Sequence, residues 1–313
     1  MRNGRSIDFA LACAGGRRAR IPHQRQVGFQ KARSGDSGCR PAGVRGDAGV
    51  NAFAQAQDRQ PLLSVRDIAV HFGGIKALDG VSFGLERGQI LGLIGPNGAG
   101  KTTLFNCLSR LYTPTSGDIL FAGATLLDRP AHRVAESGIG RTFQNLATFS
   151  RLSVRDNIRI GAHSASNSDI ASDALRLPWV RRNEAEIDGV VDELIDYLEL
   201  ARVADMPASG LPFGTLKRVE LARALASKPT LLLLDEPAGG LNHDEITELG
   251  ERIRKIRDDR NVTILLVEHH MNLVMAISDI VVVLNFGRKI SEGSPATVQA
   301  DPEVIRAYLG DGK

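Results

Sequence analysis

The stretch "GPNGAGKTT" at residues 95–103 fits the pattern G-x-x-x-x-G-K-[S/T], which is typical of loops that bind nucleotide phosphates. The apolar run "ILGLI" at 90–94 precedes it and a helix-like segment begins at Lys101. Glycines let consecutive backbone N–H groups turn toward phosphate oxygens, and the helix N-terminus adds its dipole. The sequence therefore predicts a nucleotide site. Its expected lining residues are Gly95, Pro96, Asn97, Gly98, Ala99, Gly100, Lys101, Thr102 and Thr103.

Two side chains of this loop predict how a nucleotide would be held. Lys101 can reach the β- and γ-phosphates, and the Thr102 hydroxyl can ligate Mg²⁺. We therefore expect a nucleotide with a β- and a γ-phosphate, together with Mg²⁺. The loop alone is equally compatible with a GTPase, a kinase or a motor protein, so the class of reaction depends on other residues.

Strands that alternate with helices predict an α/β fold around the loop. Buried-strand runs stand at "TLLLLDEP" (230–237), "VTILLVEHH" (262–270) and "DIVVVLNFG" (279–287), with helical stretches between them. Fully apolar strands that alternate with helices indicate a parallel sheet covered on both faces. Ahead of the loop, "LSVRDIAVHF" (63–72) and "VSFGL" (81–85) alternate in polarity and predict half-buried strands.

Two helices are predicted from apolar residues that recur at helical spacing. The first is "KTTLFNCLSRL" at 101–111, with its apolar face at Leu104, Phe105, Leu108 and Leu111. The second lies in a helical middle region at about 150–205. Its apolar face comprises Ile187, Val190, Val191, Leu194, Ile195 and Leu198.

The acidic pair Asp235–Glu236 at the end of "LLLLDEP" favours hydrolysis over transfer to another substrate. A carboxylate that emerges from a buried strand is costly without a cation, and Mg²⁺ or its water shell would supply one to Asp235. Glu236 is placed to polarise a water that attacks the γ-phosphate in line. We therefore expect Asp235 at the metal and Glu236 as the catalytic base.

Residues 1–61 differ in composition from the rest of the chain. Residues 1–60 contain 11 Lys and Arg against four Asp, and they are rich in Gly, Ala, Ser and Gln without sustained periodicity. This composition is typical of a disordered extension. A tether for nucleic acid or anionic lipid would also be basic, but no aromatic or helical pattern favours it. A third interpretation is that the true translation start lies downstream and that this segment is not part of the natural protein.

Cysteine usage and hydropathy narrow the class of protein. The three cysteines are widely spaced and contain no C-x-x-C pair, which argues against a disulfide framework and a zinc site. No apolar run approaches the roughly 20 residues that span a bilayer. If the protein works at a membrane, we expect it to bind peripherally, without spanning the bilayer.

Over about residues 62–313, the sequence resembles the ATPase subunits of ABC transporters. Phe72 stands where the family has an aromatic residue that stacks on adenine. Gln144, in "RTFQN" (141–145), matches the glutamine that links the Mg²⁺ site to the membrane subunits. His269 matches the switch histidine that contacts the γ-phosphate. The resemblance thus implies that the cofactors are ATP and Mg²⁺, that Glu236, His269, Lys101 and Gln144 are catalytic, and that Thr102, Gln144 and Asp235 hold the metal.

The stretch "LPFGT" (211–215) occupies the place of the family's LSGGQ signature, of which Leu211 and Gly214 remain. In the family this loop binds the γ-phosphate held by the other ATPase subunit. The resemblance therefore implies that Gly214 and Thr215 contact nucleotide in trans, through backbone N–H groups at a helix start. Pro212 has no N–H to contribute.

Several motifs resemble the branched-chain amino acid importer ATPases of the LivG type. They are "RTFQNLATF", "LPFG" with "LKRVELARAL", "DEPAGGLN", "VEHHMNLVM" and "DPEVIRAYLG". Asn242 and His270 depart from that pattern, since each stands where aspartate is usual. The resemblance implies a parallel-sheet core with an antiparallel β subdomain and a helical subdomain. We expect an ATPase domain at 62–293, its helical subdomain at about 146–215, and a C-terminal helical extension at 294–313.

The resemblance also implies partners and a place in the cell. We expect inner-membrane permease subunits, a second ABC ATPase in a dimer, indirectly a periplasmic solute-binding protein, and no nucleic acid. The subunit would lie peripherally on the cytoplasmic face of the bacterial inner membrane. Three alternatives stay open: the ATPase of a urea or amide importer, that of a lipopolysaccharide exporter, and a soluble ABC ATPase without a transport role.

Overall fold

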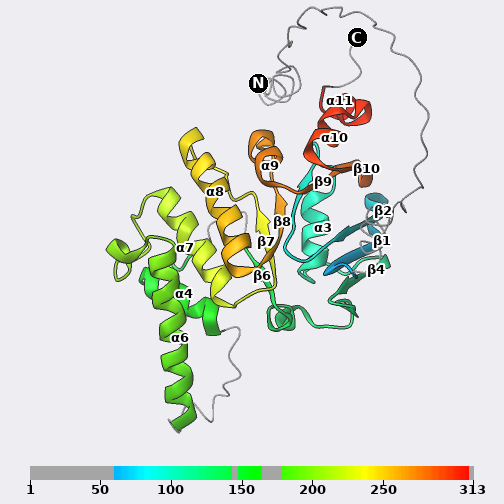
Figure 1. Ribbon diagram of the computed structural model, residues 1–313. Coiled ribbons are helices and arrows are strands. Elements are labelled where there is room, and N and C mark those ends of the chain that lie inside the picture. Colours follow the sequence, from blue (N-terminus) through cyan, green and yellow to red (C-terminus); the bar gives the residue numbers. More distant parts are fainter. Residues whose placement is uncertain (1–59, 143–146, 164–177, 310–313) are drawn as a thin grey trace, which may run out of the picture.

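The computed structural model describes residues 60–142, 147–163 and 178–309 (Figure 1). Most of the predicted N-terminal extension lies outside these residues, and so does Gln144. Among the residues that the structure describes, no helix is both long enough and apolar enough to cross a membrane.

The strands form two sheets, one parallel in its core and one antiparallel. The strands are β1 Leu63–Phe72, β2 Ile75–Leu85, β3 Ile90–Ile94, β4 Ser116–Phe121, β5 Ala124–Thr125, β6 Ile139–Arg141, β7 Leu231–Asp235, β8 Thr263–Val267, β9 Ile280–Asn285 and β10 Arg288–Gly293. The larger sheet has the order β10-β9-β3-β8-β7-β6, and the smaller has the order β2-β1-β4-β5. In the larger sheet only β10 runs antiparallel to its neighbour, so the predicted parallel core is confirmed.

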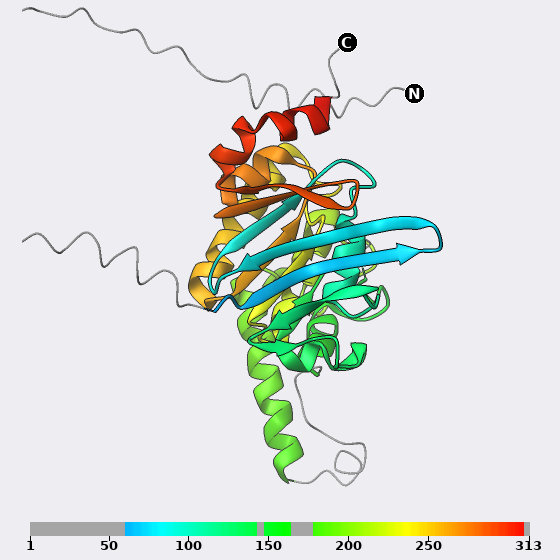
Figure 2. The ribbon, with the colours of Figure 1, turned by 90° about the vertical axis from the view of Figure 1, so that its right-hand side faces the viewer.

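Helices cover the larger sheet on both faces (Figure 1). The helices are α3 Lys101–Leu108, α4 Val154–His163, α6 Pro178–Tyr197, α7 Phe213–Ala226, α8 His243–Arg260, α9 Met271–Ile277, α10 Pro295–Ala300 and α11 Pro302–Leu309. Short 3₁₀ turns occur at Ala131–Arg133, Ala135–Ser137 and Ala201–Val203. The helix α6 extends away from the sheets (Figure 2).

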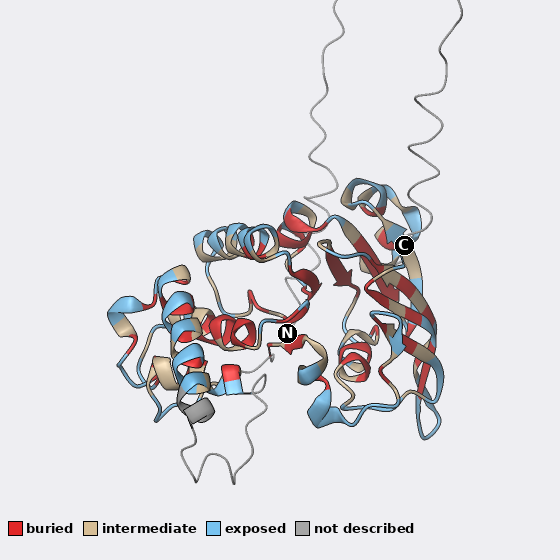
Figure 3. Cartoon of the chain, turned by 60° about the horizontal axis from the view of Figure 1, so that its bottom comes forward, coloured by how far each residue is buried: buried red, intermediate tan, exposed pale blue. Residues whose placement is uncertain are grey.

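Alternation along the buried strands separates two hydrophobic cores. In β3, Ile90 and Ile94 face the core that α7, α8 and α9 share, whereas Leu91 and Leu93 face the core that contains α3 and the antiparallel sheet. Successive side chains of a strand point to opposite faces, so one apolar run serves both cores. Buried residues accordingly concentrate in the strands and on the inward faces of the helices (Figure 3).

The structure corrects one predicted helix and adds strands. The helix that begins at Lys101 ends at Leu108, so the prediction that Leu111 lies on its apolar face is wrong; Leu111 is 56% exposed. The break follows from Arg110, which has a positive φ of 60° that cannot continue a right-handed helix. The sequence "SGDILFAG" (116–123) predicts a short strand, which is confirmed in β4, whereas β5, β6 and β10 had no predicted counterpart.

The predicted apolar face of the middle helix is confirmed in α6. Ile187, Val191 and Leu194 are buried against the core beneath α4 and α7. The division of the chain into an ATPase domain, a helical subdomain at about 146–215 and a C-terminal extension stays a prediction.

Candidate active site

The phosphate-binding loop connects β3 to α3, as predicted. Gly95 has a φ of +152°, and a Cβ there would lie 2.2 Å from the Leu284 carbonyl oxygen. Gly100 has a φ of +100°, and its Cβ would lie 2.7 Å from the Ala77 carbonyl oxygen. The loop is thus pressed between β9 and the start of β2, where only glycine leaves room.

Lys101 begins α3 and folds back over the loop. Its Nζ donates hydrogen bonds to the carbonyl oxygens of Gly95 at 2.7 Å and Pro96 at 3.0 Å. Burial lowers the pKa of the Lys101 ammonium, and the charge of Glu236 opposes this shift. The Lys101 ammonium group is therefore already held at the phosphate-binding loop.

Asp235 ends β7 and is only 3% exposed. Its Oδ2 accepts a hydrogen bond from Arg141 Nη2 at 3.1 Å. Arg141 also donates to Ser109 at 2.7 Å and Asn106 at 3.0 Å, and it stacks over the Phe105 ring at 5.1 Å. Burial raises the pKa of Asp235, and Arg141 opposes the shift. The cation that accompanies this carboxylate is thus Arg141, which the sequence analysis did not identify.

The residues at this edge of the sheet fit a magnesium ion. Thr102 is the second residue of α3, which follows β3, and Asp235 ends β7; both strands flank β8, and all three are parallel. A hydroxyl and a buried carboxylate are the oxygen donors that Mg²⁺ prefers. Gln144, the third predicted ligand, lies outside the described residues.

Glu236 turns sharply out of β7. It has a φ of +47°, uncommon for a residue with a side chain, and its N–H donates to the Val267 carbonyl oxygen at 2.9 Å. Its Oε2 lies 3.8 Å from Nδ1 of His269, and its charge acts on Lys101. The structure therefore brings together three of the four predicted catalytic side chains.

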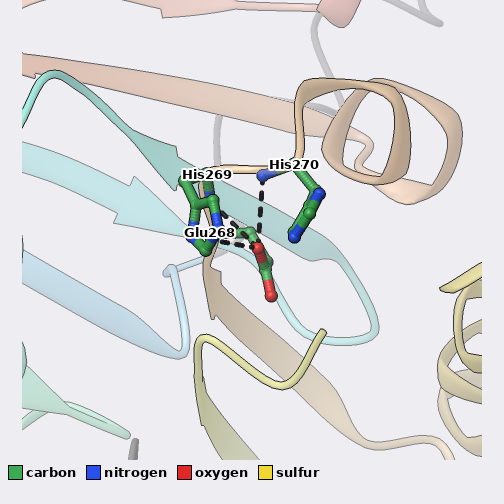
Figure 4. A group of neighbouring side chains, drawn as sticks. All are labelled: Glu268, His269 and His270. Carbon is green, nitrogen blue, oxygen red and sulfur yellow. Dashed lines mark hydrogen bonds and ion pairs between the residues drawn. The ribbon is translucent and has the colours of Figure 1, made fainter. Parts of the chain in front are cut away.

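His269 belongs to a group with Glu268 and His270 (Figure 4). Its Nδ1 lies 3.7 Å from Glu268 Oε2, and its ring centroid lies 4.4 Å from that of His270. Glu268 was missed by the sequence analysis. The available signal was an acidic residue directly after the buried run "TILLV".

Phe72 stands at the β1–β2 turn and is 48% exposed. It makes an edge-to-face contact with Tyr112, with ring centroids 5.4 Å apart. The strand β2, which follows the turn, carries Ala77, the residue against which Gly100 packs. Phe72 therefore presents an exposed aromatic ring on the hairpin that borders the phosphate loop.

The signature stretch forms the first turn of α7, with Pro212 as N-cap. The Thr215 N–H, expected to contact phosphate, donates instead to the Pro212 carbonyl oxygen at 3.0 Å. A Cβ at Gly214 would lie 3.1 Å from Oε1 of Glu245. A side chain at Gly214 would therefore meet a carboxylate of its own chain.

Asn242 acts within its own chain. Its side chain accepts from the Glu245 N–H at 3.0 Å, and Glu245 Oε2 accepts from the Asn242 N–H at 2.8 Å. This reciprocal pair is a capping box at the N-terminus of α8. Asparagine caps a helix as well as aspartate does, so the departure at Asn242 preserves the local structure.

The C-terminal helix α11 reaches the phosphate loop. Tyr308 lines a cleft of about 630 Å³ together with Gly95, Pro96 and His269. Burial raises the pKa of Tyr308, and a hydrogen bond with the backbone of Gly95 opposes the shift. The fold thus connects the C-terminal end of the described chain to the first glycine of the nucleotide site.

A glycine-built phosphate cradle at the C-terminal edge of a parallel sheet, joined by Asp235, Glu236 and His269, defines a P-loop ATPase of the ATP-binding cassette type. The sequence model of the family described as "ABC transporter" matches residues 78–239. A second model, "Branched-chain amino acid ATP-binding cassette transporter", matches residues 288–313. The chain belongs to the ABC transporter family, as one of its ATPase cassettes.

Named relatives and solved structures agree with this family. The chain is 40% identical over 252 residues to the high-affinity branched-chain amino acid transport ATP-binding protein BraF of Pseudomonas aeruginosa, covering 80% of this chain and 99% of BraF. It is 42% identical over the same length and coverage to LivG of Escherichia coli. A nucleotide-free ATP-binding cassette from an ABC transporter superposes with a TM-score of 0.69 at 28% identity, covering 80% and 99% of the two chains.

Proposed function

We propose that this chain is the ATP-hydrolysing subunit of an ABC importer that takes up branched-chain amino acids. The observation that carries the substrate class is the match of residues 288–313 to the branched-chain amino acid family. The 40% and 42% identities to BraF and LivG, across 99% of each relative, support it. The residues of a nucleotide site do not contact the transported amino acid, so the substrate is assigned through the transporter to which the subunit belongs.

In the proposed reaction, the phosphate loop and Lys101 hold the triphosphate of ATP. Thr102 and Asp235, with Gln144, would hold Mg²⁺, which neutralises charge on the phosphates. Glu236 accepts a proton from the attacking water, and His269 contacts the γ-phosphate. The distance of 3.8 Å between Glu236 and His269, with Lys101 in the field of Glu236, supports this assignment.

We place the signature residues Gly214 and Thr215 at the nucleotide of a second ATPase subunit. The helices α7 and α3 pack into the two different cores of the larger sheet, so the signature helix and the helix that follows the phosphate loop lie on opposite faces. Such an arrangement favours a dimer in which each nucleotide lies between two subunits. The Gly214 N–H and the α7 dipole would serve the phosphate there.

An apolar cleft offers a surface for a permease subunit. The cavity has a volume of about 500 Å³ and is lined by Leu111, Phe149 and Ile160, each substantially exposed. Exposed apolar clusters of this kind mark contact sites for other proteins. Arg141 also lines the cavity and bonds to Asp235, so a docked segment would lie one side chain from the proposed metal site.

The proposed assembly comprises permease subunits, a second ATPase and indirectly a periplasmic solute-binding protein, without nucleic acid. This chain would lie at the cytoplasmic face of the inner membrane, attached through the permeases. The test is to reconstitute the complete transporter in vesicles and measure ATP-dependent uptake of radiolabelled leucine, isoleucine and valine. Urea and short amides serve as competing substrates. Uptake of urea or amides without uptake of the amino acids would refute the substrate assignment.

A further inference from the structure

We propose that Glu268 is a positioning residue that fixes the separation of Glu236 and His269. Glu268 touches neither phosphate nor water in this proposal; it acts by holding the backbone next to the two side chains that do. The inference rests on the proposed roles of Glu236 and His269 in hydrolysis.

Three backbone N–H groups converge on the Glu268 carboxylate. Oε1 accepts from the Ala238 N–H at 2.7 Å. Oε2 accepts from the His269 N–H at 2.9 Å and from the His270 N–H at 3.2 Å (Figure 4). Hydrogen bonds to an ionised acceptor are stronger than neutral ones, so this carboxylate is a firm anchor for both segments.

The anchored segments are those that carry the catalytic side chains. Ala238 lies two residues after Glu236, at the start of the loop that leaves β7. His269 follows Glu268 directly at the end of β8. One side chain therefore ties the loop after Glu236 to the backbone of His269, and the 3.8 Å separation of their side chains depends on it.

The environment of Glu268 shows what stabilises its charge. The residue is 1% exposed, and Ala238 is fully buried. Among the described residues, no lysine or arginine lies within ion-pair distance of this carboxylate. A buried carboxylate can be held ionised by backbone N–H groups, which supply fixed dipoles in place of water.

The same group offers ligand atoms for a metal, since one atom each of Glu268, His269 and His270 lie within 4.8 Å of one another. The hydrogen bonds favour the backbone-positioning role of Glu268 instead. Both carboxylate oxygens already accept backbone protons, and a ligated cation would compete with these bonds. We therefore assign Glu268 to the backbone rather than to a metal ion.

The decisive substitution is Glu268→Gln. Glutamine has nearly the same shape, but one oxygen becomes an NH₂ donor, and either orientation of the amide sets that donor against a backbone N–H. Loss of a buried hydrogen bond with an unsatisfied donor corresponds to roughly a 10- to 100-fold change in an equilibrium or rate. We expect kcat for ATP hydrolysis to fall by this factor while the Kd for ATP stays unchanged, because the phosphate loop is not touched.

The measurement uses the full chain assembled with its partner ATPase and permeases. Two quantities are measured for the variant and for the wild type: ATPase turnover per folded molecule, and the Kd of a fluorescent ATP analogue in the presence of Mg²⁺. The matched control is Glu292→Gln on β10, whose carboxylate pairs with Lys289 on the surface. We expect the control to leave kcat and Kd unchanged.

The outcomes separate positioning from stability. Wild-type kcat in Glu268→Gln, or a lower thermal midpoint with normal turnover of the folded fraction, would overturn the inference. If Glu268→Gln does not fold, Glu268→Asp keeps the charge on a shorter stem, and a normal kcat in that variant would equally overturn it. Glu236→Gln is measured in parallel: if it keeps normal turnover, the proposed catalytic site fails, independently of Glu268.

Discussion

Buried acidic residues stand where the adjacent strands β7 and β8 end, Asp235 as the last residue of β7 and Glu268 directly after β8, but they are stabilised in different ways. Asp235 is paired with the guanidinium of Arg141 at 3.1 Å. Glu268 is held by backbone N–H groups at 2.7 to 3.2 Å. A side-chain cation can share or release its partner when a metal ion arrives, whereas main-chain donors cannot move without unfolding a loop. Under the proposed function, Asp235 would therefore exchange one cation for another, whereas Glu268 would keep its backbone partners.

The largest effect is expected at Glu236, which follows Asp235 directly in the chain. The substitution Glu236→Gln keeps the shape but removes the ability to accept a proton, and general-base catalysis contributes roughly 10²- to 10⁴-fold. We expect hydrolysis to fall by that factor while MgATP binding persists. Turnover is measured in the reconstituted transporter, with analogue binding as control. Near-normal turnover would show that Glu236 is not the catalytic base.

A large effect on stability is expected when Asp235 loses its cation. Arg141→Met leaves a buried carboxylate uncompensated, which typically costs about 3–5 kcal/mol in the free energy of unfolding. Denaturant unfolding measures this loss. Because Mg²⁺ would supply the missing charge, we expect MgATP to stabilise the variant more than it stabilises the wild type.

The double variant Arg141→Met with Asp235→Asn is the control, since it removes both charges and should recover part of the stability. Equal stabilisation of wild type and Arg141→Met by MgATP would contradict the view that Asp235 exchanges one cation for another.

The smallest effect is expected at a neutral hydrogen bond beside the same edge of the sheet. Tyr308→Phe removes the hydroxyl that bonds to the backbone of Gly95, and such a bond contributes about 1 kcal/mol. We expect ATP affinity to fall about fivefold, with kcat unchanged. A matched change of a phenol far from the loop, Tyr197→Phe, should leave affinity unaltered. Loss of affinity in both variants would show that α11 does not steady the loop.

The nucleotide cradle could be predicted from the sequence because its chemistry is local. The spacing of glycines before Lys101 requires a strand, a tight turn and a helix in succession, and the structure confirms all three. The parallel sheet was predictable for a similar reason, since uninterrupted apolar runs are typical of strands covered on both faces.

The end of the first helix was not predictable in the same way. Leu111 continues the helical spacing of apolar residues, yet the chain leaves the helix at Leu108. Periodicity describes which residues favour burial, and it does not predict the positive φ of Arg110. The exposed Leu111 instead lines the apolar cleft that we propose as the permease contact.

By itself, the sequence determined the class of fold, the phosphate cradle and the acidic pair Asp235–Glu236, because each follows from residues close together in the chain. His269 was singled out by the resemblance to a known family. Only the tertiary structure decided the partners of these residues. Arg141 reaches Asp235 across 94 positions and Glu268 reaches Ala238 across 30, since the sheet order sets β6 beside β7 and β7 beside β8. Hydrophobic periodicity carries no information on that order, so the contacts that set the charges and distances of the site arise only when the strands assemble.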